Sequence, residues 1–118
     1  MPAFEFEGKN YNNPAELAID KIGGKWKMPI LWRLRERTWR YGEMRKSLEK
    51  SSGGITHQML TKQLRELEED GLISRKVYAE VPPKVEYTIT DKGMKVIPVI
   101  DALRDFGRML MQEQGIME

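Results

Sequence analysis

Residues 53–93 read GGITHQMLTKQLRELEEDGLISRKVYAEVPPKVEYTITDKG, and the spacing of apolar residues changes once along this stretch. Before Gly71 the apolar residues recur at the 3.6-residue period of a helix, whereas after it they alternate with polar residues, as in strands. Thr56 is a good helix N-cap, Gly71 is a good stop, and Pro82-Pro83 interrupts the alternating run. The stretch therefore predicts a helix followed directly by a β-hairpin with a proline-containing tip. The apolar face of the helix is formed by Leu60, Leu64 and Leu67, helped by Met59.

The same signals predict the elements on either side. These are a helix from Asn13-Pro14 to Gly23-Gly24, a helix over 25–36, a short strand over 38–40, a helix over 41–50 and a last helix over 91–114. Two helices joined by a glycine turn and followed by a hairpin form a winged helix-turn-helix. We therefore expect a mainly α fold with a small β-hairpin (α+β). We divide the chain into an N-terminal arm, residues 1–12, one domain, residues 13–112, and a C-terminal tail, residues 113–118.

The composition of the 118-residue chain argues against several classes of function. There is no cysteine and only one histidine, His57, so neither thiol chemistry nor a cysteine- or histidine-rich metal site is expected. No nucleophile-elbow or phosphate-loop motif is present, so we expect neither an enzyme nor a cofactor. The apolar runs are too short to span a membrane and no signal peptide is visible, so we expect a cytoplasmic protein without a membrane partner.

Basic residues are concentrated in one part of the chain. Residues 25–50 hold nine basic and three acidic side chains, a net charge of +6 in a chain whose net charge is +2. Such a concentration indicates a basic face for an anionic partner, and with the predicted fold that partner is double-stranded DNA. A solvated helix surface would give the same pattern.

The predicted helix after Thr56 carries the residues expected to read DNA. Its polar side chains share one face, opposite the leucines, and all can hydrogen-bond to base edges or phosphates. In a winged helix this helix enters the major groove by its N-terminal half. A solvated amphipathic helix is the alternative interpretation. The candidate contacts are Thr56, His57, Gln58, Thr61, Lys62 and Arg65.

The predicted hairpin supplies candidate phosphate contacts. Arg75, Lys76 and Lys84 lie on it, where they would position the protein beside the groove rather than specify sequence. Pro82-Pro83 would stiffen the tip, although an ordinary rigid loop uses prolines in the same way.

Several short motifs, in their order and spacing, resemble the HxlR family of winged helix-turn-helix transcriptional regulators. The resemblance extends from about Asn13 to Gly107. The motifs are Ile22-Gly23-Gly24-Lys25-Trp26, Arg40-Tyr41-Gly42-Glu43-Met44-Arg45, Gly54-Ile55-Thr56, Leu64-Arg65-Glu66-Leu67-Glu68, Asp70-Gly71-Leu72-Ile73 and Pro82-Pro83-Lys84-Val85-Glu86-Tyr87. The resemblance implies a sequence-specific DNA-binding regulator, acting as a repressor, with Arg40 and Arg45 among its backbone contacts. Arg40-Tyr41 would place a cation and a core aromatic at the start of the third helix.

The chain departs from the family pattern at two positions. Many members carry a cysteine before the proline of the first helix, and in some it senses electrophiles or oxidants, whereas here Asn13 takes that position. Thiol-based sensing is therefore not expected. Phe106-Gly107 replaces the Trp-Gly of the last helix and keeps an aromatic residue there.

The resemblance also implies a homodimer, and the predicted N- and C-terminal helices support it as dimerisation helices. An apolar stripe runs along about six turns of the last helix, more than a small winged-helix core covers. Two-fold symmetry would present two reading helices about 34 Å apart to a pseudo-palindromic operator. The candidate interface residues are Leu17, Ile19, Ile100, Leu103, Phe106, Leu110 and Met111.

Two other functions stay open as alternatives: a winged helix that serves only as a protein-interaction module, and a MarR-like ligand-responsive regulator. A small-molecule effector, unidentified, is an open class of partner. Trp26 is expected in the core, whereas Trp32 and Trp39 fit either the core or a small-molecule pocket. The eight methionines fit adaptable packing at a core or dimer seam better than a ligand pocket.

Overall fold

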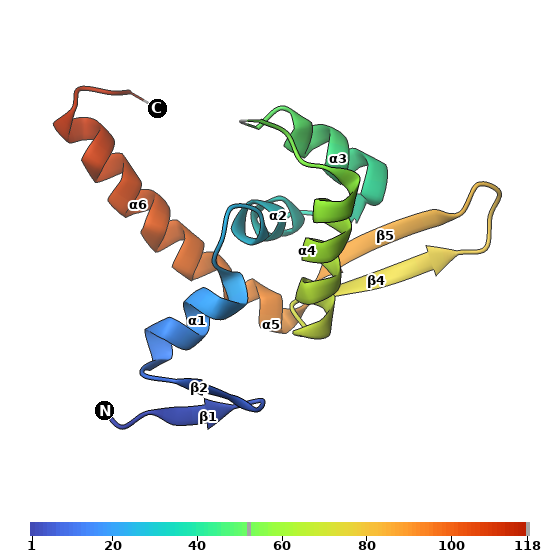
Figure 1. Cartoon of the computed structure of the whole chain (residues 1–118). Helices are drawn as coiled ribbons and strands as arrows, with labels where there is room; N and C mark the ends of the chain where they lie inside the picture. Colours follow the sequence, from blue (N-terminus) through green and yellow to red (C-terminus); the bar gives the residue numbers. More distant parts are fainter. Residues whose placement is uncertain (52, 118) are drawn as a thin grey trace.

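The computed structural model describes residues 1–51 and 53–117 (Figure 1). Its helices are α1 Pro14–Ile22, α2 Lys27–Leu34, α3 Tyr41–Glu49, α4 His57–Glu69, α5 Asp91–Met94 and α6 Ile97–Glu113. Its strands are β1 Phe4–Phe6, β2 Lys9–Tyr11, β3 Trp39–Arg40, β4 Ile73–Tyr78 and β5 Lys84–Ile89. The fold is α+β and is a winged helix-turn-helix, as predicted.

Helices α3 and α4 form the helix-turn-helix unit. The Oγ1 atom of Thr56 accepts a hydrogen bond from the Met59 amide at 3.1 Å, so Thr56 caps α4 as predicted. At the other end Gly71 has a φ of +75°, a left-handed conformation that glycine reaches without strain. The amide of Leu72 then donates to the carbonyl of Leu67 and closes the last turn. Both ends of α4 are thus set by residues that the sequence identifies.

The hairpin β4–β5, the wing, extends away from the helices (Figure 1). Strand β3 pairs with the base of β5, so the sheet order is β3-β5-β4 and all pairs are antiparallel. Trp39 lies opposite Tyr87, and Ile73 lies opposite Ile89. Because β3 covers only the base, the outer half of the wing is a two-stranded ribbon that projects from the domain.

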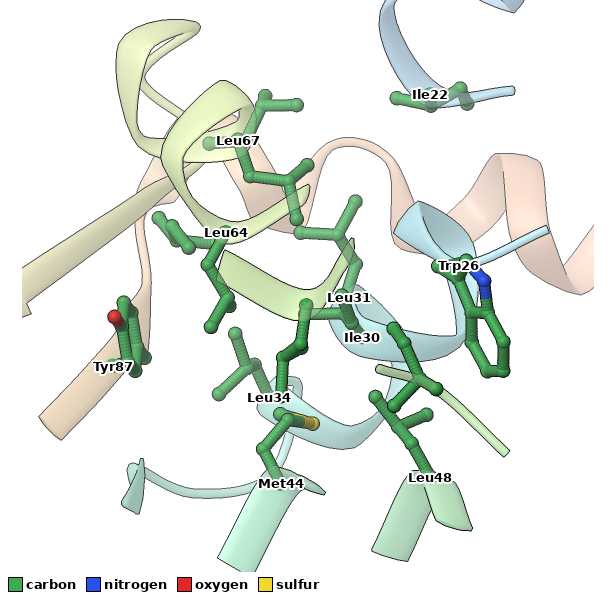
Figure 2. Close-up of a cluster of buried hydrophobic side chains, with 14 of the residues drawn as sticks. Ile22, Trp26, Ile30, Leu31, Leu34, Met44, Leu48, Leu64, Leu67 and Tyr87 are labelled. Carbon is green, nitrogen blue, oxygen red and sulfur yellow. The ribbon is translucent and has the colours of Figure 1, made fainter. Parts of the chain in front are cut away.

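The core lies where α2, α3 and α4 meet (Figure 2). Helix α2 is central to it, with three buried apolar side chains facing the other two helices. Burial of each such side chain stabilises the fold by about 1.5–3 kcal/mol. Trp26 closes one edge of the cluster and is a core residue, as predicted. The fully buried residues are Ile30, Leu31, Leu34, Met44, Leu48, Leu60, Leu64, Leu67 and Ile73.

The last helix is interrupted, so the prediction of one helix over residues 91–114 is wrong. Helix α5 ends at Met94 and α6 begins at Ile97. Pro98 has no amide that could donate to the carbonyl of Met94, and its ring would clash with that carbonyl in a continuous helix. Gly93 packs tightly on the wing, since a Cβ there would lie 2.1 Å from the carbonyl oxygen of Leu72. Helix α5 therefore stays on the wing while α6 turns away from it and passes α2 (Figure 1).

The N-terminal arm contains a β-hairpin, which the sequence did not predict. Strands β1 and β2 pair antiparallel around Glu7 and Gly8, whose φ values of 50° and 79° match a tight two-residue turn. Tyr11 is buried, and its hydroxyl donates to Asp20 of α1 at 2.6 Å. Lys9 pairs with the same carboxylate at 3.2 Å. The hairpin is therefore attached to α1 by polar contacts that alternation alone does not reveal.

The molecule is elongated for its length. Its radius of gyration is 16.2 Å, whereas a compact domain of this size has about 13–14 Å. Helix α6 and the wing project from the helical body in different directions (Figure 1). In the ranges described above, the helices are too short or too polar to cross a lipid bilayer.

Candidate nucleic-acid interface

The polar face of α4 is exposed over its N-terminal three turns. All six candidate reading residues, from Thr56 to Arg65, are exposed, while the leucines behind them are buried. The prediction that Met59 belongs to the apolar face is wrong. Met59 is exposed, and its sulfur accepts a hydrogen bond from Gln63 Nε2 at 3.2 Å. Position 59 is one residue, or about 100°, from the leucine stripe, which turns it out of the core. The exposed surface of α4 is therefore polar except for the thioether of Met59.

The two cations of this face are both accessible to an anion. Arg65 Nε lies 4.0 Å from Glu69 Oε1, one turn along the same helix, and both side chains are mostly exposed. Exposed pairs of this kind contribute only about 0.3–0.5 kcal/mol, so a phosphate could replace the carboxylate. Lys62 forms no ion pair with any residue that the structure describes.

A groove of about 670 Å³ separates the N-terminal end of α4 from the wing. Its walls include Tyr41 of α3, His57 and Thr61 of α4, Arg75 of β4 and the proline tip of the wing. These residues are far apart in the sequence, and the packing of α3 and the wing around α4 brings them together. The groove is open to solvent.

Tyr41, which sequence reasoning placed in the core, packs against the core and also lines the groove. Its hydroxyl is hydrogen-bonded to Nδ1 of His57, and the two rings meet edge to face with centroids 5.3 Å apart. With Nδ1 engaged, Nε2 is the ring nitrogen left for a phosphate or a base. The motif Arg40-Tyr41 was the signal in the sequence, but the contact partner sixteen residues away could not be read from it.

The wing cations lie on opposite faces of the hairpin. Because side chains alternate along a strand, Arg75 shares a face with its cross-strand partner Tyr87, whereas Lys76 and Lys84 share the other. Both lysines lie over the Tyr78 ring, at 4.8 and 4.5 Å from its centroid. Lys84 also pairs with the neighbouring Glu86 at 3.6 Å. Arg75 and Lys84 both line the groove, whereas Lys76 does not.

Tyr87 marks where the groove meets the core. Burial raises the pKa of the Tyr87 hydroxyl above its ordinary value, and a hydrogen bond with Arg75 acts in the opposite direction. Tyr87 and Arg75 are cross-strand partners, so they lie side by side where the wing joins the core.

Arg40 and Arg45 differ in position although one motif contains both. Arg40 is exposed and lines the groove. Its amide donates to Glu43 Oε1 at 2.9 Å, and this bond, helped by Arg37 at 3.3 Å, lowers the pKa of the Glu43 carboxyl. Arg45 is half-buried outside the groove, and its Nε lies 3.8 Å from Glu49 Oε1 on the same helix. Of these two arginines, only Arg40 therefore lies beside the polar face of α4.

Acidic side chains gather at the far end of α4 and meet lysines from the body of the domain. Lys27 pairs with Glu66 at 3.4 Å, and Lys21 pairs with Asp70 at 3.3 Å. The acids therefore lie away from the N-terminal end of α4 and are partly neutralised there. The end of α4 that adjoins the wing is therefore the end whose charges attract a polyanion.

The candidate dimer residues are mostly accessible in the single chain. Ile100 differs, because it is 6% exposed and packs in the core of the same chain. Phe106 is 57% exposed, which is unusual for a phenylalanine in an isolated domain. The exposed members are Ile19, Leu103, Phe106 and Leu110, and the half-buried members are Leu17 and Met111.

Comparison with known proteins gives one consistent result. A family model described as HxlR-like helix-turn-helix matches residues 21–115, which is most of the chain. The chain is 48% identical over 99 residues to an uncharacterized HTH-type transcriptional regulator of Methanothermobacter thermautotrophicus, covering 84% of this chain and 72% of the relative. These matches are to regulators rather than to enzymes.

Two solved structures show the same fold. The redox regulator HypR in its oxidized form superposes with a TM-score of 0.72 at 40% identity, over 82% of this chain and 96% of HypR. A transcriptional regulator of Porphyromonas gingivalis W83, assigned to the MarR family, superposes with a TM-score of 0.74 at 36% identity, over 89% of this chain and 95% of that protein.

Proposed function

The chain belongs to the HxlR-like helix-turn-helix family of transcriptional regulators, and on this basis we propose that it binds double-stranded DNA sequence-specifically. In this proposal a homodimer occupies a pseudo-palindromic operator in the cytoplasm and acts as a repressor. The observation that carries the proposal is the exposed polar face of α4 beside a groove that the wing completes.

Helix α4 would enter the major groove by its N-terminal half. Gln58, Thr61 and Lys62 carry the donors and acceptors that distinguish base edges there. Thr56 and His57 lie at the helix N-terminus, where the helix dipole favours a phosphate. The bond from Tyr41 would hold the His57 ring in place for that contact.

The wing would lie over the sugar–phosphate backbone next to the reading helix. Arg75 and Arg40 line the groove between α4 and the wing, which supports a contact of both with backbone phosphates. Lys84 lines the same groove, and Lys76 would meet backbone that passes the outer face of the hairpin. Such contacts set the position of the domain and do not select bases.

Dimerisation would supply the second half-site. The exposed apolar side chains of α6 and α1 lie on elements that the winged-helix core leaves uncovered. Burying them against a second copy would place two α4 helices about 34 Å apart, one turn of B-DNA. A dimer bound across a promoter excludes other proteins from it, which is the physical basis of repression.

The alternatives differ in what they need. A winged helix that only binds proteins needs no cluster of exposed cations around α4. A MarR-like ligand-responsive mode is favoured by one observation, the structural match to a protein assigned to the MarR family, and it adds an effector to DNA binding rather than replacing it.

HypR is described as a redox regulator, but thiol chemistry does not transfer to this chain. The sequence has no cysteine, so neither a disulfide nor a sulfenate can form within it. Any effector would act by non-covalent binding or through a partner.

The proposal is tested by selection from a library of random duplexes, followed by affinity measurements across salt. We expect an enriched motif with two-fold symmetry. Affinity for it should fall about 10³–10⁵-fold between 50 and 200 mM salt if 6–10 phosphates are contacted. Selection without an enriched motif, together with affinity that does not change with salt, would contradict DNA reading and favour a protein-interaction module.

A further inference from the structure

A second groove, of about 600 Å³, lies between α2 and α6, away from the groove beside the wing. Trp32, one of the two tryptophans that sequence reasoning left open, forms part of its wall, with Met28 and Leu103 as apolar lining. Arg33, Lys25 and Arg104 also line it, and among the described residues around the groove none is acidic. Its volume falls in the range of small-molecule sites, about 300–1,000 Å³.

Arg33 is the most informative of these cations. It is half-buried, its Nε donates to Ser47 Oγ at 2.8 Å, and an Nη donates to the Pro29 carbonyl at 3.0 Å. Both partners are neutral, and no carboxylate of the described residues pairs with it. Burial lowers the pKa of the Arg33 guanidinium below its ordinary value, since no neighbouring acid offsets the loss of water. A bound anion would supply that charge compensation.

The wall of the groove is planar as well as cationic. The Arg104 guanidinium, which also lines the groove, lies 4.6 Å from the centroid of the Trp32 ring. The Arg35 guanidinium, which is not part of the lining, lies 3.7 Å from the same centroid. This stack joins α2 to α6. Flat aromatic and guanidinium surfaces favour a flat ligand, because stacking buries the most area at the least entropic cost.

We propose that the groove between α2 and α6 is an effector site for a small planar organic anion, an aromatic carboxylate, with Arg33 as the cation that binds its carboxylate and Trp32 as part of its aromatic wall. This inference adds an effector to the proposed function. A ligand there would touch α2, which packs on the core beneath α4, and α6, which carries the candidate dimer residues. Its occupancy would therefore act on the spacing of the two reading helices.

The test is direct binding without DNA, so its outcome does not depend on the proposed DNA reading. The probe is 2-naphthoate, measured by titration calorimetry and by the indole N–H resonances of the three tryptophans. 2-Naphthamide, with the same shape but no charge, and acetate, with the charge but no ring, are the matched ligands. We expect naphthoate to bind with a Kd on the order of 0.1 mM and both controls to bind at least about tenfold more weakly. The Trp32 resonance should shift while that of Trp39 does not.

Substitutions in and outside the groove show whether naphthoate binds in it. Arg33→Gln should weaken naphthoate at least about tenfold. Arg37→Gln, which removes an arginine stacked on Trp39 at 3.9 Å outside the groove, should leave it unchanged. If Arg33→Gln does not fold, Ser51 offers a second pair on the groove lining: Ser51→Glu should abolish binding, and Ser51→Gln should keep it.

Three results would overturn the proposal. Naphthamide could bind as tightly as naphthoate, the Arg33 and Ser51 variants could bind like the wild type, or naphthoate could fail to bind at millimolar concentration. In the last case, a fall of the molecular mass on Arg33→Gln would assign the groove to contact between subunits instead.

Discussion

At the scale of single residues, polar side chains with the same sequence signal differ in what already contacts them. Lys62 projects from the face of α4 without an ion-pair partner in the described chain, whereas Lys84 is held by Glu86 and by the Tyr78 ring. A lysine that must first leave other partners contributes less to a new contact. Lys62 is therefore expected to contribute more to DNA affinity than Lys84.

The first prediction concerns the reading face. Lys62→Ala and Arg65→Ala should each lower operator affinity and reduce the salt slope by about one, because each removes one cation from the duplex. Fluorescence anisotropy at several salt concentrations measures both quantities. Lys95→Ala, an exposed lysine at the α5–α6 junction, is the matched control and should bind like the wild type. Wild-type affinity in both α4 variants would remove this face from the interface.

At the scale of the elements, the wing has two faces with different cations. Arg75→Ala should weaken binding to all sequences by a similar factor, about tenfold, because it removes a cation that lines the groove. Lys76→Ala should have a smaller effect, since Lys76 lies on the outer face over Tyr78. Competition assays with operator variants measure the affinities. A loss confined to one base position would show that Arg75 specifies sequence, contrary to the prediction.

From the contacts of the N-terminal hairpin we expect part of the free energy of unfolding to depend on pH in the acid range. The Tyr11 hydroxyl, and then Lys9, donate to Asp20 and hold the pKa of its carboxyl below the ordinary 3.8. A carboxyl whose pKa is lower in the folded state stabilises the fold above its unfolded pKa, and this contribution is lost as the pH falls through the folded pKa. Tyr11→Phe should raise that pKa and therefore flatten the loss of stability on acidification.

Urea unfolding at pH 7 and at about pH 3 measures this term as the difference in unfolding free energy. The wild type should lose more stability between the two conditions than Tyr11→Phe does. Tyr78→Phe, whose ring lies between two lysines on the wing, is the control and should behave like the wild type. Equal losses in Tyr11→Phe and the wild type would mean that the hydroxyl does not set the pKa of Asp20.

At the scale of the whole molecule, the elongated shape and the uncovered side of α6 predict a dimer. Light scattering should give twice 13.8 kDa for the wild type. Phe106→Glu should give a mass near 13.8 kDa, because a buried carboxylate would oppose the apolar contact. Ile100→Ala tests the core instead of the dimer contact. Because it removes a buried side chain, it should lower the free energy of unfolding by about 2–5 kcal/mol. A monomeric wild type would also remove the reason to expect a palindromic operator.

Local signals in the sequence were enough for most of the helix-turn-helix and the wing. The cap at Thr56, the stop at Gly71 and the change of period between α4 and β4 depend on neighbouring residues, and the structure confirms all three. The exposed face of α4 follows from the same periodicity, because leucines that turn inward leave the residues between them outside. The motifs quoted for the family lie in the same region, which is why the family could be inferred before the fold.

Tertiary structure decided what depends on contacts between distant residues. The N-terminal hairpin packs on α1 because Tyr11 and Asp20 meet. Tyr41 packs against the core and also reaches the groove, because α3 lies beside the start of α4. Packing also separated Ile100, which lies in the core, from Phe106, which stays exposed six residues later on the same helix. Sequence spacing indicates which residues share a face of one helix, whereas the neighbour that covers this face is chosen only when the chain folds on itself.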